Sequence, residues 1–213
     1  LQMRTAMQHV WSTIEHDIGS KTDVKIQNEY LRQFSRLAGT LELVDNEFSR
    51  LRTEITNYRR QMKALLKNGQ LDDVLLSSDS FRSYLELNPF DRLNKHIAAV
   101  NQAELYPVSM MPFLSIFESF GFETLGDVQR FIEENSEDAY QLALSQLAIT
   151  DLDMFSTTAA PLYLFQVYPL KHDDSPTRLI FIYHTLNGKT DSNITQADMM
   201  LEQAKTLPFM HSE

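Results

Sequence analysis

Cysteine is absent from the 213 residues of this sequence, which excludes disulfide bonds and metal sites built from thiolates. No apolar run approaches the roughly 20 residues that a membrane-spanning helix needs, so we expect no membrane partner. Basic side chains are in the minority, with 19 Lys and Arg against 29 Asp and Glu. A chain without thiols that lacks a membrane segment suits a reducing compartment, and we expect it to be cytoplasmic.

The basic residues are unevenly distributed along the chain. The first 68 residues hold 11 basic and 8 acidic side chains, whereas the remainder holds 8 and 21. The acidic second part is a poor match for a phosphate backbone, so we expect no nucleic-acid partner. The change of composition at Asn68-Gly69 predicts a boundary between two modules, residues 1–68 and 69–213.

The first 18 residues change their apolar period. Leu1 and Met3 alternate with Gln2 and Arg4, which is typical of a strand. From Ala6 onward the apolar residues recur at helical spacing: Met7, Val10, Trp11, Ile14 and Ile18. A lone strand cannot satisfy its own backbone groups, so we expect the strand to complete a sheet that lies upstream of this chain.

The strongest periodic signal lies in residues 34–65. Apolar side chains follow one another at steps of three and four: Phe34, Leu37, Leu41, Val44, Phe48, Leu51, Ile55, Tyr58, Met62 and Leu65. This is the a/d pattern of a coiled coil, and we call it the seam. With Phe34 at position a, Glu47 and Glu54 fall at g, while Arg52 and Arg59 fall at e. Opposite charges at g and e attract across two helices.

Two interpretations of the seam stay open. The helix could pack its apolar face on its own chain, or it could associate with a second copy to form a homo-oligomer through residues 34–65. Gly39 and the hydroxyl residues allow a break into two helices, and Asn68-Gly69 is a typical helix stop.

Beyond Gln70 the turn signals separate short helices. We expect these over residues 80–87, 90–100, 112–120, 125–134, 136–148 and 195–206. Residues 159–184 are apolar, aromatic and interrupted by prolines, so strand and buried helix both fit. The fold class is therefore mainly α: long amphipathic helices, then a bundle of short helices with possible short strands near the C-terminus.

One segment carries a specific motif, Q-x-R-T, five residues, W-S, two residues and E-H. Its matching positions are Gln2, Arg4, Thr5, Met7, Trp11, Ser12, Glu15 and His16. The motif resembles the end of the synthetase domain in the RelA/SpoT family, whose enzymes make the alarmones ppGpp and pppGpp. The family usually has Ala where Ser12 stands. The likeness covers residues 1–21, and nothing beyond Gly69 shares it.

The resemblance implies that residues 1–68 are the last strand and the helices of an α+β, nucleotidyltransferase-like synthetase domain. It implies a nucleotide-binding role for Gln2, Arg4 and Ser12 and a supporting role for Glu15 and His16. Alternation along a strand would turn Gln2 and Arg4 toward one cleft. The parent enzyme would be a GTP pyrophosphokinase that transfers diphosphate from ATP to the 3′-hydroxyl of GTP or GDP, with Mg²⁺.

The family's catalytic acid stands two positions before the glutamine, so it would precede Leu1. The chain would then hold no catalytic residue and no Mg²⁺ ligand of its own. The alternative is a non-catalytic helical module that serves interaction, oligomerisation or regulation.

Incubation of the 213-residue chain with ATP, GTP and Mg²⁺ is expected to give no guanosine tetra- or pentaphosphate, because the acid that would activate the hydroxyl lies outside it. Nucleotide chromatography measures the product. Accumulation of either alarmone would show that the catalytic parts lie within these residues.

Overall fold

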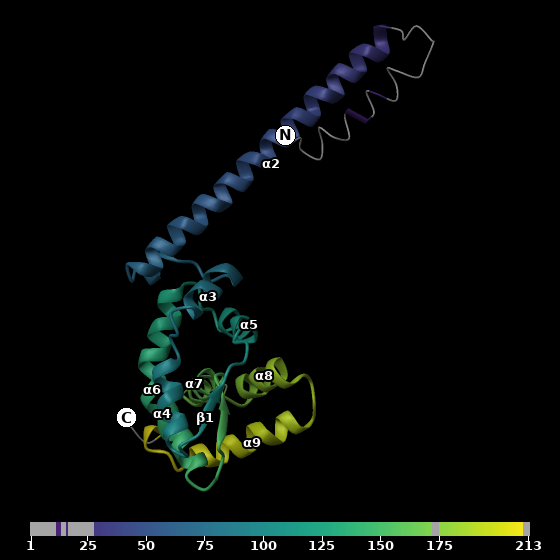
Figure 1. Ribbon diagram of the computed structural model, residues 1–213. Coiled ribbons are helices and arrows are strands. Elements are labelled where there is room, and N and C mark those ends of the chain that lie inside the picture. The colour runs from purple at the N-terminus through teal and green to yellow at the C-terminus, as the bar shows by residue number, and fades with distance from the viewer. Residues whose placement is uncertain (1–11, 14–15, 17–27, 172–174, 211–213) are drawn as a thin grey trace. The chain divides into compact units, whose positions relative to one another are not determined.

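The computed structural model describes residues 12–13, 16, 28–171 and 175–210 (Figure 1). The chain divides into two compact units, Leu1–Gln61 and Met62–Glu213. The described residues are mainly helical, as the sequence predicts. The predicted strand lies outside the described residues, and of the helix expected after it, Ser12, Thr13 and His16 are described and are helical.

Helix α2 spans Asn28–Lys67 as one helix (Figure 1). The possible break at Gly39 is not present, and the space beside that residue is open. The helix ends where Asn68-Gly69 predicts it. Gly69 has a φ of 73°, a left-handed conformation that glycine adopts without a Cβ clash. The last residues of α2, from Met62, belong to the second unit.

The second unit continues with short helices and two short strands. In chain order these are η1 Leu71–Asp73, α3 Ser78–Leu85, α4 Asp91–Ala99, β1 Glu104–Tyr106, α5 Pro112–Ser119, α6 Leu125–Leu147, β2 Met154–Ser156, α7 Ala159–Leu170, α8 Ser175–Asn187, α9 Ser192–Ala204 and η2 Pro208–Met210. The two strands pair in parallel, with Leu105 opposite Phe155. They lie earlier in the chain than the strands expected near the C-terminus.

The two helices expected over 125–134 and 136–148 are one helix, α6. Ser136 does not cap a new helix, because its hydroxyl bonds to the carbonyl of Ile132 one turn back. Helix α6 begins at Leu125, as predicted, and its N-terminus has a capping box in which Asp127 accepts from the N–H of Thr124 at 2.8 Å. Burial would raise the pKa of Asp127, but the N–H groups of Thr124 and Glu123, the Thr124 hydroxyl and the Arg130 guanidinium together lower it.

The ambiguous segment 159–184 forms helices α7 and α8, so its strand interpretation is wrong. Pro161 lies in the first turn of α7 and Pro176 in the first turn of α8, where a missing N–H removes no helical hydrogen bond. Nine of the twelve α7 residues are buried, which explains why its sequence shows no helical period.

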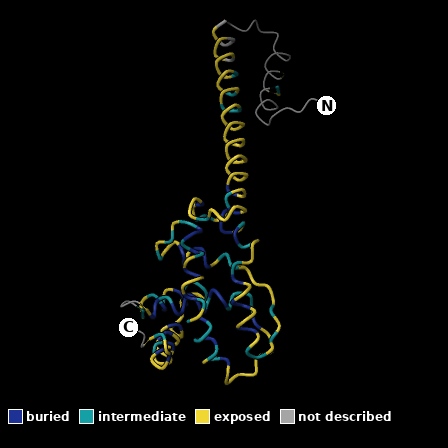
Figure 2. Tube along the Cα trace, turned by 90° about the vertical axis from the view of Figure 1, so that its left-hand side faces the viewer, coloured by how far each residue is buried: buried dark blue, intermediate teal, exposed yellow. Residues whose placement is uncertain are grey.

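The core of the second unit is aromatic. Phe117 of α5, Phe131 of α6 and Phe165 of α7 meet, with ring centroids 4.6 Å apart for Phe117 and Phe165 and 5.0 Å apart for Phe131 and Phe165. Figure 2 shows buried positions throughout the second unit, in contrast to most of α2. Burial raises the pKa of Tyr183 to about 12, so its hydroxyl stays neutral and accepts from Gln166 at 3.0 Å.

A buried asparagine joins α4 to the turn after β2. Asn94 is 2% exposed; its amide nitrogen donates to the carbonyl of Thr157 at 2.7 Å, and its oxygen accepts from the N–H of Ala160 at 2.9 Å. One side chain thus satisfies two backbone groups at the start of α7.

Replacing Asn94→Ala is expected to lower the free energy of unfolding by about 2 to 4 kcal/mol, because both backbone groups lose their partner. Urea denaturation followed by circular dichroism measures the change. Asn101→Ala is the matched control, since Asn101 bonds to Thr150 at an exposed position and its loss should cost under about 1 kcal/mol. Equal effects of the two substitutions would contradict this role of Asn94.

Candidate functional site: the exposed face of helix α2

The residues predicted to bind nucleotide are only partly described. Gln2, Arg4 and Glu15 lie outside the described residues. Ser12 is helical and half-buried, and His16 is helical and exposed. The nucleotide-binding set therefore stays a prediction, and the candidate site that the described residues form lies on α2.

Much of the seam of α2 is exposed. The side chains with large exposed fractions are Leu37 at 59%, Phe48 at 64%, Leu51 at 47%, Ile55 at 52% and Tyr58 at 49%. Leu41 and Val44 are half-buried. Figure 2 shows most of the helix in the colour of exposed residues. Large apolar side chains in a row on one face usually mark a contact surface.

The seam changes character at the end of α2. Met62 is 3% exposed and Leu66 is 7% exposed, and both belong to the core of the second unit. Leu65 packs against the same core. Packing on the chain's own core therefore explains the last part of the seam. It does not explain the stretch from Leu37 to Tyr58, which no described residue covers to a comparable degree.

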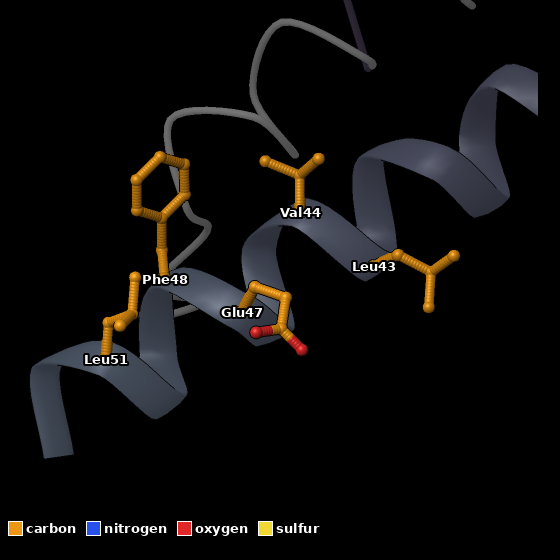
Figure 3. A pocket seen from close by; sticks show the side chains of 5 residues that line it. All are labelled: Leu43, Val44, Glu47, Phe48 and Leu51. Atoms are coloured by element: carbon orange, nitrogen blue, oxygen red, sulfur yellow. The ribbon is translucent and has the colours of Figure 1, made fainter. Parts of the chain in front are cut away.

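Five side chains of α2 line a shallow hollow, shown in Figure 3: Leu43, Val44, Glu47, Phe48 and Leu51. Val44 and Phe48 project from the same side of the helix, and the Glu47 carboxylate stands at its edge (Figure 3). Leu43 is 68% exposed and falls at heptad position c, beside the seam. The a/d spacing does not predict its part in this surface; an apolar residue directly before Val44 was the available signal.

Charged side chains flank the seam. Arg50 donates to Glu47 at 2.7 Å, and its Nε lies 4.0 Å from a carboxylate oxygen of Glu54. All three side chains are more than half exposed, so each of these pairs contributes less than about 1 kcal/mol. Arg52 and Arg59 are exposed along the opposite edge of the seam.

A second hollow lies in the second unit, lined by Ser119, Phe120, Thr177, Arg178 and Phe181. The guanidinium carbon of Arg178 lies 5.2 Å from the centre of the Phe120 ring, a cation–π contact. None of the five lining residues is a general base, so this hollow offers no pair of groups for catalysis.

Neither a metal site nor a membrane-spanning helix is found in the described part of the chain. There, no group of three or more His, Asp or Glu side chains is close enough to hold a metal ion. Among the described helices, none combines the length and the apolar content that crossing a lipid bilayer requires.

Comparison of the chain with models of protein families, with curated proteins and with solved structures found no match. The assignment of a function therefore rests on the residues themselves: the motif in residues 1–21 and the exposed seam of α2.

Proposed function

We propose that this chain is the C-terminal part of an alarmone synthetase of the RelA/SpoT type. The observation that carries the proposal is the spacing of Gln2, Arg4, Trp11, Ser12 and the Glu15-His16 pair in one short segment. The helical state of Ser12, Thr13 and His16 is compatible with the helix that the resemblance places there.

The proposed reaction is a transfer of diphosphate. The 3′-oxygen of GTP or GDP attacks the β-phosphorus of ATP, the bond between that phosphorus and the α-β bridging oxygen breaks, and AMP leaves. The proton of the hydroxyl passes to the carboxylate of the acidic residue that the family places two positions before Gln2. Catalysis of this kind depends mainly on positioning and on neutralising phosphate charge.

The residues of this chain would bind and orient the two nucleotides and would not take part in the proton transfer. Arg4 offers a planar fork of donors that matches two phosphate oxygens. Gln2, which would lie on the same face if these residues form the expected strand, would orient a sugar or a base. A small side chain at Ser12 would let the guanine approach the backbone, and Glu15 and His16 would hold the helix against the sheet.

A second candidate function is supported by the described structure itself. The exposed stretch of the seam favours an interaction or oligomerisation module, in which residues 34–65 join copies of the chain. Two-fold assemblies are the commonest homo-oligomers. The two candidate functions are compatible, because the helix follows the motif and could assemble the enzyme.

In the full gene product, Arg4→Ala is expected to lower the rate of alarmone synthesis by about 100-fold or more, because a phosphate-binding donor acts mainly in the transition state. Nucleotide chromatography measures the rate, and thermal unfolding should be unchanged. Arg92→Ala, which removes an exposed arginine of α4, is the control and should retain activity. A variant that keeps turnover but loses stability would show that Arg4 is structural.

Leu51→Lys is expected to reduce the mass of the assembled chain to that of the 24.7 kDa monomer, because it places like charges across the seam and desolvates them. Sedimentation measures the mass, and circular dichroism should show that helicity persists. Thr53→Lys, at position f on the outer face, is the control and should leave the mass unchanged. An unmodified chain that is monomeric at tens of micromolar would contradict the assembly.

A further inference from the structure

We infer that α2 pairs with α2 of a second copy of this chain as a parallel, in-register, two-stranded coiled coil through Leu37–Tyr58. The inference rests on the proposed assembly role and adds the direction and the register in which the two copies pair. It concerns the part of α2 that lies in the first unit.

The exposed part of the seam is long enough for such a contact. From Leu37 to Tyr58 it covers three heptads, about 30 Å of helix at a rise of 1.5 Å per residue. Positions a carry Leu41, Phe48 and Ile55, and positions d begin with Leu37. The remaining d positions are Val44, Leu51 and Tyr58. Every a and d position in this stretch is apolar or aromatic, so a facing helix with the same sequence finds a continuous surface.

The flanking charges identify the occupant as a second copy. In a parallel, in-register pair, position g of one helix faces position e of the next heptad in the other. Glu47 then faces Arg52 of the second copy, and Glu54 faces Arg59 of the second copy. The two-fold symmetry repeats both contacts on the other side of the seam. The sequence thus complements itself.

An antiparallel pair reverses this complementarity. Position g would then face g, and e would face e. Neither Glu47 nor Glu54 would then reach an arginine at position e, and in the register that brings these two glutamates together they repel each other. Charges at e and g set the orientation of coiled coils, so the parallel arrangement is favoured.

The contact between Glu47 and Arg50 within one helix does not oppose the pairing. Glu47 already accepts from Arg50, at position c, but a carboxylate has acceptor sites for more than one donor. Both side chains of that pair are more than 60% exposed, so the carboxylate reaches the seam without leaving a buried site.

A parallel pair has a consequence for the proposed enzyme. The chain that precedes Asn28 leaves both copies of α2 at the same end of the coil. The segments that carry the motif are therefore joined to the same end of the coil in both copies rather than to opposite ends.

Cysteine cross-linking tests the direction of pairing, since the natural chain has no cysteine. Two single variants are made, Leu37→Cys at position d and Ile55→Cys at position a, with Thr53→Cys at position f as the control. Each is oxidised with diamide alone, and the first two are also oxidised as a mixture. Non-reducing electrophoresis and mass spectrometry identify the products, and sedimentation of the unmodified chain is measured in parallel.

The parallel pair predicts that the Leu37→Cys and Ile55→Cys variants each form a disulfide-linked dimer when alone, at least tenfold faster than the Thr53→Cys variant. An antiparallel pair centred between these positions would instead give mainly the mixed 37–55 disulfide. That result would overturn the direction but keep the assembly. A monomer in sedimentation, with no cross-link above the control, would overturn the assembly itself. Neither result bears on alarmone synthesis, which the Arg4→Ala variant tests separately.

Discussion

The second unit depends on the packing of α6 against α7. Phe131 and Phe165 lie in contact at the centre of this pair, and α5 adds Phe117 to the same cluster. At the far end of α7, Lys171 reaches back to Asp138 of α6 at 2.5 Å and to Asn135 at 3.1 Å. The apolar contacts supply most of the stabilisation, and the polar ones set how the two helices align. The neighbouring helices pack on the α6–α7 pair and complete the core.

Helix ends were predictable from the sequence where a single residue determines the backbone conformation. Gly69 ends α2, Thr124 begins α6, and Pro112 begins α5, each as its chemistry dictates. Prediction was wrong at Ser136 because a serine that follows a helical turn can bond back to it as readily as it can cap a new helix. The α7 segment was undecided because burial on all sides erases the period that separates helix from strand.

The candidate site shows a different limit. The spacing from Phe34 to Leu65 predicted which face of α2 is apolar, but it did not predict where along the helix that face becomes buried. The structure shows that Met62 and Leu66 enter the core of the second unit, whereas Phe48 and Ile55 stay exposed. The motif at Gln2 and Arg4 was recognised by resemblance alone, and its geometry lies outside the described residues.

The parallel pairing of β1 with β2 bears on how the second unit folds. Glu104 meets Met154 only after the chain between them, with α5 and α6, has crossed over. The pairing is thus a contact between residues distant in sequence, and the loop it closes has a high entropic cost. The second unit, although mainly helical, should therefore fold more slowly than a bundle of sequential helical hairpins, with the strand contact forming after α6 has found its partners.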